Sequence, residues 1–312
     1  MITLNLNELY EIKSDVSQKK IYRFKDQSIK KILVDFSYNF SDYLSFINVH
    51  KYLSTKNVSI PQIFEINDNQ KLILMEDFGE NRYDKIINSH DFKSMLFNAI
   101  DSLISIQKFE KPSVTQGFEK YNYTHFRKEI IEFVDFYLPL LKTSPDQTEE
   151  FIQIWTEEFK KLNFNWDSFV HKDFELTNLM YLPHKENHLK CGILDFQNAL
   201  IGFSGWDLFS LLENPRIFFD EKHNQELVEY FYIKSNQDMS YNDFLLQYFF
   251  LNAARQTRII GRWINLDKKN KNDYYHSNFH TVTITRLKNS LFNLQNKKIT
   301  KLYEKILENA KI

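Results

Sequence analysis

The first 78 residues alternate between short apolar runs and one helical pattern. Residues 19–36, KKIYRFKDQSIKKILVDF, contain two runs of strand-forming residues around a polar tripeptide, which suits a hairpin. Residues 41–56 carry apolar side chains at helical spacing behind a Ser/Asp start signal. Residues 61–79 hold two more strand-like runs joined by a polar turn. The pattern predicts strand, strand, helix, strand, strand.

After Gly79 the pattern changes to long helical segments. Apolar residues recur at helical spacing over residues 91–109, 124–142, 147–163, 221–235, 240–263 and 276–310. The exception is residues 168–198, where SFVHKDF, NLMYL and CGILDF are short strand-like runs separated by polar turns. We therefore expect an α+β protein with a small β-rich N-terminal lobe, residues 1–78, and a larger, mainly helical C-terminal lobe, residues 79–312.

Composition narrows the class of protein without naming a function. The 312 residues are 43% hydrophobic and 26% charged, as in an ordinary globular protein, and no run of apolar residues is long enough to cross a membrane. The N-terminus has no secretory pattern, so we expect a cytoplasmic protein. A net charge of −1 gives no general attraction to nucleic acid or to anionic membranes and favours a small-molecule partner. The single cysteine, Cys191, is expected to be a small buried residue.

Three polar residues follow or end strands in the middle segment. Asp173 comes after FVHK, Asn178 lies five residues later, and Asp195 ends CGIL. Magnesium prefers oxygen ligands and commonly uses only one or two protein side chains, which Asn178 and Asp195 can supply. A phosphoryl-transfer enzyme also needs an acceptor for the proton of the attacking hydroxyl, and Asp173 is the candidate.

The spacing His-x-Asp-x4-Asn, with an aspartate 17 residues after the asparagine, is that of a kinase catalytic loop and its metal-binding aspartate. HKDFELTNLM followed by ILDFQNALIGFSGWDLFSLL resembles the aminoglycoside phosphotransferase and choline kinase-like enzymes, a branch of the protein kinase-like fold. LDFQNA, WDLFSLLENPR and LNAARQTRIIGRW look most like the cell-wall-recycling kinases that phosphorylate N-acetylmuramate and N-acetylglucosamine at C1. The resemblance runs from about residue 14 to residue 286.

The resemblance implies a bilobal kinase-like fold that uses ATP and Mg²⁺. It gives Asp173 the role of catalytic base and Asn178 and Asp195 the role of magnesium ligands. Asp207 would position the catalytic loop through a hydrogen bond, and His171 would be structural.

The nucleotide contacts implied by the resemblance lie in the first lobe. MEDFG matches the segment between the lobes, where main-chain groups of Glu76, Asp77 and Phe78 would receive a purine. Lys31 is the candidate for the phosphate-contacting lysine, although the family places that lysine nearer Val34. No glycine precedes Gly79 and the helix at 41–56 has no Glu, so a glycine-rich loop and the usual lysine–glutamate pair are missing. The turn at 26–28 or the preceding SDVSQ stretch would have to cover the phosphates.

Two other sets of residues have a simpler explanation. His184 and His188 lie in a polar turn after Pro183 and are expected to be solvated rather than metal-binding. Arg255, Arg258 and Arg262 share one helical face; a solvated or salt-bridged face is favoured over contact with an anionic substrate group.

We therefore expect an ATP-dependent kinase acting on a small molecule, most specifically on the anomeric hydroxyl of an N-acetylated amino sugar. The alternatives are a kinase of the same fold for an aminoglycoside, choline or another sugar, and a nucleotide-binding pseudokinase. The sequence gives no indication of the oligomeric state.

Overall fold

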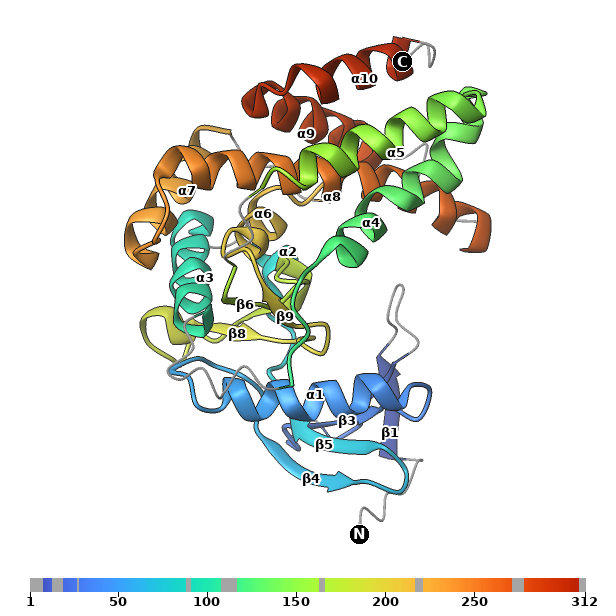
Figure 1. The fold of residues 1–312 in the computed structure, drawn as a ribbon. Helices are drawn as coiled ribbons and strands as arrows, with labels where there is room; N and C mark the ends of the chain where they lie inside the picture. Colours follow the sequence, from blue (N-terminus) through green and yellow to red (C-terminus); the bar gives the residue numbers. More distant parts are fainter. Residues whose placement is uncertain are drawn as a thin grey trace. The chain divides into compact units, whose positions relative to one another are not determined.

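The computed structural model describes residues 8–12, 19–26, 28–87, 91–107, 117–162, 166–216, 221–270 and 278–308. The chain divides into two compact units, each built from two separate stretches (Figure 1). Unit 1 comprises residues 1–118 and 169–200, and unit 2 comprises residues 119–168 and 201–312. The lobe boundary at residue 79 is a different division of the chain and stays a prediction.

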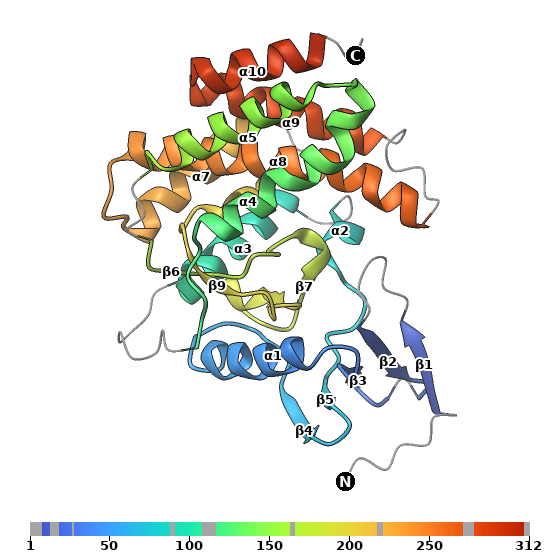
Figure 2. The same cartoon turned by 45° about the vertical axis from the view of Figure 1, so that its right-hand side comes forward.

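Unit 1 contains a five-stranded antiparallel sheet in the order β1-β2-β3-β5-β4 (Figure 2). Its strands are β1 Leu9–Ile12, β2 Lys20–Phe24, β3 Lys31–Asp35, β4 Ile63–Asn67 and β5 Leu72–Glu76. The last four confirm the strands expected from the sequence, and β1 was not predicted.

The two faces of this sheet carry different side chains. Because directly paired residues share a face, Tyr22, Leu33 and Leu74 form one row across β2, β3 and β5. They pack in a small core with Leu9 and Phe24. The opposite face carries the row Ile21, Val34 and Ile73.

One helix lies beside the sheet, and unit 1 also contains further helices and a hairpin. Helix α1, Phe40–Leu53, begins at Asn39, whose side chain accepts hydrogen bonds from the N–H groups of Ser41 and Asp42. The other elements are α2 Tyr83–Ile86, α3 Phe92–Gln107 and the hairpin of β7 Leu179–Tyr181 and β8 Cys191–Ile193. Cys191 is buried as expected, and burial raises the pKa of its thiol to about 12.

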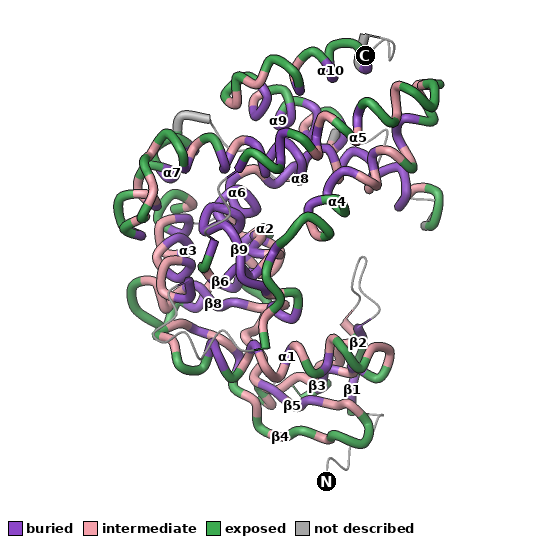
Figure 3. The backbone as a smooth tube through the Cα atoms, in the orientation of Figure 1, coloured by how far each residue is buried: buried purple, intermediate pink, exposed green. Residues whose placement is uncertain are grey.

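Unit 2 is helical. Its helices are α4 Tyr123–Glu132, α5 Pro145–Phe159, α6 Trp206–Leu212, α7 Glu221–Ser235, α8 Tyr241–Asn270, α9 Asn278–Leu294 and α10 Lys297–Glu308. Much of α8 is buried, as the purple tube in Figure 3 shows. Two short strands, β6 Ser168–Val170 and β9 Leu200–Gly202, lie where the chain passes between the units. In the part of the chain that is described, no helix is long and apolar enough to cross a membrane.

Two expected helices are interrupted. In the segment 124–142, α4 ends at Glu132. A π-helical turn, Phe133–Tyr137, and a 3-10 turn that contains a proline, Leu138–Leu141, follow it. Within the expected helix 276–310, the described residues form α9 and α10 instead of one helix, because Asn296 caps α10 by accepting hydrogen bonds from the N–H groups of Lys298 and Ile299.

Candidate active site

The β7–β8 hairpin brings two predicted metal ligands to the same end. Leu179, the first residue of β7, pairs with Ile193, the last residue of β8. Asn178 directly precedes this pair, and its carbonyl accepts a 3.0 Å hydrogen bond from the N–H of Leu194. Asp195 is the next residue after Leu194. The hairpin register therefore places Asn178 and Asp195 at neighbouring strand ends.

His171 links the loop that carries Asp173 to the segment after β8 that carries Asp195. Its ring is fully buried, and its Nδ1 accepts a hydrogen bond from the N–H of Asp173 at 3.3 Å. The other nitrogen, Nε2, therefore carries the proton and donates to the carbonyl of Leu194 at 3.0 Å. Burial lowers the pKa of His171 despite the nearby carboxylates of Asp173 and Asp195. These contacts support the structural role expected for this histidine.

Asp173 is held by hydrogen bonds on both its main chain and its side chain. Its carbonyl accepts from Nδ2 of Asn178 at 2.8 Å, and its Oδ2 accepts from Nδ2 of Asn198 at 2.8 Å. Lys172, just before it, has a left-handed backbone with φ of 79°. The loop thus presents the carboxylate of Asp173 on a fixed backbone, and the bond to its carbonyl directs the amide nitrogen of Asn178 away from any cation.

Asp195 lies in a polar contact network on a strained backbone. It has φ of 62°, an uncommon value for a residue with a side chain. Lys19 forms an ion pair with its Oδ1, and Gln197 donates to the same oxygen at 3.1 Å. Burial acts to raise the pKa of Asp195, but the charge and hydrogen bond of Lys19, with the bond from Gln197, outweigh it and hold the pKa below its usual range. The carboxylate is therefore ionised at neutral pH.

The oxygen atoms of Asn178 and Asp195 have the chemistry that Mg²⁺ requires. With its Nδ2 bonded to the loop, Asn178 has Oδ1 available as a neutral oxygen ligand, and Asp195 supplies an ionised one. Among the described residues, no group of three or more His, Cys, Asp or Glu side chains could hold a metal ion. Two protein ligands are nevertheless the usual number where a magnesium ion is shared with phosphate oxygens. The donor set fits the metal.

The expected purine-binding segment directly follows β5. The main-chain N–H groups of Glu76 and Asp77 already donate to Gln62 and Lys30, at 2.8 and 3.1 Å. This leaves the main chain of Phe78 as the remaining candidate donor among the three predicted residues.

The Asp77 side chain is also occupied, by Arg23 from β2. The guanidinium reaches both carboxylate oxygens of Asp77, at 2.6 and 2.9 Å, and also bonds the carbonyl of Gly79 at 2.9 Å. Arg23 was not singled out in the sequence. Its contacts fix the shape of the segment that would receive the purine.

Lys31 pairs with Glu76 across β3 and β5, but the structure does not bring its ammonium to Asp195. Its ammonium lies over the ring of Phe64, 4.6 Å from the centroid. Lys31 is two residues before Leu33, so the two side chains share the sheet face opposite Val34. Lys19, which the sequence analysis missed, contacts Asp195 instead. The only signal for it was a lysine directly before a strand, next to the SDVSQ stretch, which lies outside the described residues.

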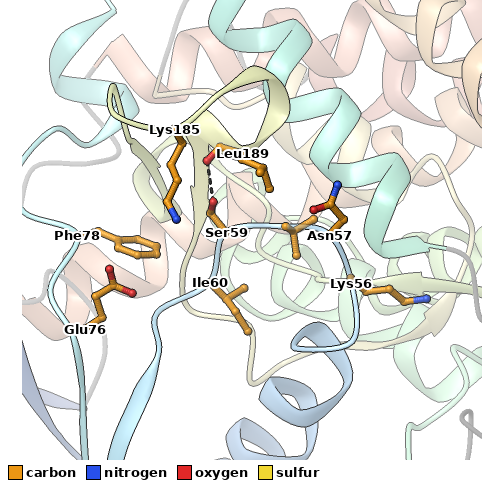
Figure 4. Close-up of a pocket in the computed structure, with 9 residues that line it drawn as sticks. Lys56, Asn57, Ser59, Ile60, Glu76, Phe78, Lys185 and Leu189 are labelled. Atoms are coloured by element: carbon orange, nitrogen blue, oxygen red, sulfur yellow. Dashed lines mark hydrogen bonds between the residues drawn. The ribbon is translucent and has the colours of Figure 1, made fainter.

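Unit 1 also has a polar pocket of about 240 Å³. In Figure 4, Ser59 donates to the carbonyl of Leu189 at 2.7 Å, and the Lys185 side chain extends toward the same space. Glu76 and Phe78 line it, whereas Asp173, Asn178 and Asp195 do not. It is therefore separate from the metal-ligand pair.

In unit 2, the arginine-bearing face of α8 is salt-bridged. Arg258 pairs with Glu129 and Arg262 with Glu132, each at 2.9 Å, and the Arg255 side chain is buried. Asp207 is fully buried in α6, also in unit 2. Its proposed bond to the catalytic loop stays a prediction.

Comparison with known proteins identifies the family to which the chain belongs. Residues 9–238 match the model of the phosphotransferase enzyme family, so the chain belongs to that family. An N-acetylmuramate/N-acetylglucosamine kinase of Caulobacter vibrioides is 24% identical over 71% of this chain and 63% of its own length. Other curated relatives carry the same name at 22% identity. The chain thus spans less than two thirds of the Caulobacter relative.

Solved structures share the fold. A protein from Ralstonia eutropha described as an aminoglycoside phosphotransferase superposes with a TM-score of 0.60 at 14% identity, covering 92% of this chain and 93% of the other. A spectinomycin phosphotransferase in complex with ADP and spectinomycin gives 0.58 at 13% identity, covering 89% and 92%. The expected bilobal, protein kinase-like α+β fold is confirmed.

Proposed function

We propose that the protein transfers the γ-phosphoryl group of ATP to a hydroxyl group of a small molecule. The observation that carries this proposal is the register of the β7–β8 hairpin, which sets Asn178 beside Leu194, the neighbour of Asp195, while Asn178 also bonds the carbonyl of Asp173. A base and two oxygen ligands on one rigid support are the protein groups that phosphoryl transfer requires.

Each of these residues has a separate task in the proposed reaction. Asp173 orients the substrate hydroxyl and accepts its proton as the phosphoryl group is transferred. Asn178 and Asp195 would hold Mg²⁺, which would supply positive charge to the phosphates. The hydrogen bond from Asn198 keeps the Asp173 carboxylate in one orientation, which favours in-line attack.

The nucleotide would bind at the segment after β5. Phe78 offers main-chain groups to the purine, and Arg23 holds the neighbouring Asp77 and Gly79 in place. The ADP complex of a structurally similar phosphotransferase is consistent with an adenine nucleotide.

The substrate we propose is the anomeric hydroxyl of an N-acetylated amino sugar, N-acetylmuramate or N-acetylglucosamine. The names of the curated relatives support this choice. An anomeric hydroxyl is more acidic than an ordinary alcohol, so a carboxylate such as Asp173 is an adequate proton acceptor.

An aminoglycoside is the second candidate, because the structural neighbours include aminoglycoside phosphotransferases. An aminoglycoside is a polycationic drug, so its binding site is expected to contain clustered acidic side chains. In unit 2 the buried Glu129 and the partly buried Glu213 are instead paired with Arg258 and Arg286. This pairing favours the sugar.

The test is a substrate panel with ATP and magnesium: N-acetylmuramate, N-acetylglucosamine, hexoses, choline and aminoglycosides. Release of ADP reports turnover, and phosphorus NMR identifies the phosphorylated position. We expect an anomeric phosphate of an N-acetylated amino sugar. If only an aminoglycoside or choline is phosphorylated, the proposed sugar substrate is wrong and that compound takes its place. If the protein binds ATP but turns over no compound of the panel, the result favours the pseudokinase.

A further inference from the structure

The face of β3 that carries Val34 offers no lysine to a nucleotide. The side chains on that face are Ile32 and Val34, both apolar. Lys31 faces the other way and stacks on Phe64. Helix α1, whose residues are all described, contains no Glu to pair with such a lysine. Both members of the usual lysine–glutamate pair are therefore missing from their usual elements.

Lys19, directly before β2, lies on the sheet face that carries Val34, where β3 itself offers no lysine. Lys19 is two residues before Ile21, which pairs with Val34. By strand alternation it therefore lies on the sheet face opposite Lys31. Its ammonium lies 5.8 Å from the ring centroid of Phe36, two residues after Val34. Its side chain is only 8% exposed, which is unusual for a lysine and requires a partner. That partner is the carboxylate of Asp195.

The residues that follow Asp195 pack against helix α1 of unit 1. Phe196 stacks on Phe46 of α1, with ring centroids 4.7 Å apart, and Ser45 donates to the carbonyl of Gln197. Helix α1 thus contacts the two residues that directly follow Asp195, the residue that meets Lys19. The ion pair is part of a packed arrangement, in contrast to a contact between two exposed side chains.

We propose that Lys19 is the lysine that binds the nucleotide phosphates, in place of a lysine from β3. This inference rests on the proposed ATP-dependent function. A phosphate that Mg²⁺ would hold beside Asp195 would lie within reach of the Lys19 ammonium, which already contacts this carboxylate. An ammonium has three N–H donors, so it can serve a carboxylate and a phosphate oxygen together. Without nucleotide, Asp195 neutralises the buried charge of Lys19.

The chain offers a matched control in the next residue. Lys20 is exposed and, by strand alternation, points to the opposite face of the sheet. Lys19→Met and Lys20→Met remove the same charge from neighbouring positions. Any difference between them therefore reports the local site and not the net charge of the protein.

The experiment is calorimetric titration of the wild type and both variants with ATP, ADP and adenosine in the presence of magnesium. For Lys19→Met we expect affinity for ATP and ADP to fall by about 10- to 100-fold, the loss of one charged hydrogen-bonding partner. Affinity for adenosine, which has no phosphate, should stay unchanged. Lys20→Met should match the wild type with all three ligands.

The outcomes separate this inference from the function on which it rests. Equal ATP affinity in Lys19→Met and the wild type would overturn the role of Lys19 alone. A parallel loss of ATP and adenosine binding would also overturn it, because it indicates a purely structural ion pair. A wild-type protein that binds no ATP would remove the proposed function as well. If Lys19→Met does not fold, the uncharged Lys19→Gln takes its place in the same titration.

Discussion

Asn198 donates a hydrogen bond from its side-chain amide to Oδ2 of Asp173 at 2.8 Å. Asn198 lies three residues after Asp195, so this bond ties the proposed base to the segment that carries a proposed metal ligand. A carboxylate can rotate about its last side-chain bond, and a donor on one oxygen restricts that rotation. The relation gives Asn198 a positioning role in the reaction.

Replacing Asn198 should slow turnover without weakening nucleotide binding. We expect Asn198→Ala to lower kcat by about 10-fold, since a misplaced catalytic group costs up to about 100-fold. The KM for ATP should stay unchanged. Steady-state kinetics measure both values, and Asn69→Ala, at an exposed position of the β4–β5 turn, is the control. A rise in the KM for ATP with unchanged kcat would exclude the positioning role.

Asp173→Asn removes the proposed proton acceptor but keeps the size of the side chain. We expect turnover to fall by about 10²- to 10⁴-fold, the usual contribution of a general base. Binding of ATP, measured by calorimetry, should be retained because Asp173 is not among the proposed nucleotide contacts. A variant with wild-type turnover would remove Asp173 from the mechanism.

Alternation was sufficient to predict strands β2 to β5 of the sheet, though not β1, and spacing was sufficient to select the three central candidate site residues. Asp173, Asn178 and Asp195 could be found because their chemistry is encoded in short-range spacing. By contrast, Lys19 and Asp195 are 176 residues apart, and their contact depends on which sheet face Lys19 occupies. A single sequence gives no direct signal for such a contact.

Helix α6 was missed for a different reason. All its residues are buried, so the polar face that normally reveals helical periodicity does not exist. The break between α9 and α10 was missed because it depends on one side chain, Asn296, binding two backbone N–H groups.

The Arg23–Asp77 pair should stabilise both the fold of unit 1 and the nucleotide segment. Arg23→Ala leaves the Asp77 carboxylate, only 9% exposed, without its cation, and we expect a loss of about 1.5–3 kcal/mol in unfolding free energy. Denaturant titration measures this loss. Glu80, another partner of Arg23, is 82% exposed, so Glu80→Ala should have a smaller effect.

A double-mutant cycle isolates the Arg23–Asp77 interaction. Arg23→Ala combined with Asp77→Ala should cost less than the sum of the single changes, because no unpaired carboxylate remains. Additive losses would mean that the two side chains contribute independently.

Glu158 on α5 should make stability depend on pH. Burial acts to raise its pKa, but hydrogen bonds from Lys161 and Asn296, at 2.5 and 2.7 Å, and the charges of Lys161 and Lys298 hold the pKa below its ordinary value of 4.5. A carboxyl group whose pKa is lower in the folded state contributes stability above its unfolded pKa and loses it as the pH falls through the folded value.

The measurement compares Glu158→Gln with the wild type. At neutral pH the variant should be less stable by about 1–3 kcal/mol, the range for a hydrogen bond to a charged group. The difference should shrink as the pH is lowered below about 4. Glu157→Gln, at a 45% exposed position, is the control. A difference that stays constant down to acidic pH would contradict the role of the Glu158 charge.

Gly261 permits α8 to approach the backbone at the end of α4. A Cβ atom built on Gly261 would lie 2.6 Å from the main-chain nitrogen of Phe133 and closer still to the carbonyl of Glu132. Backbone atoms cannot rotate away as a side chain can. The π-helical turn of Phe133–Tyr137 begins at this contact, so α4 changes its hydrogen-bond pattern where the two helices meet.

This close approach reverses the usual effect of replacing a helical glycine. Glycine to alanine inside a helix normally stabilises a protein by about 0.5–1 kcal/mol. We expect Gly261→Ala to destabilise unit 2 by about 1–3 kcal/mol, as overpacking does, and Gly261→Val to destabilise it further. Melting temperatures should rank the wild type above the alanine variant and the alanine variant above the valine variant. An alanine variant more stable than the wild type would show that the two helices can separate at little cost.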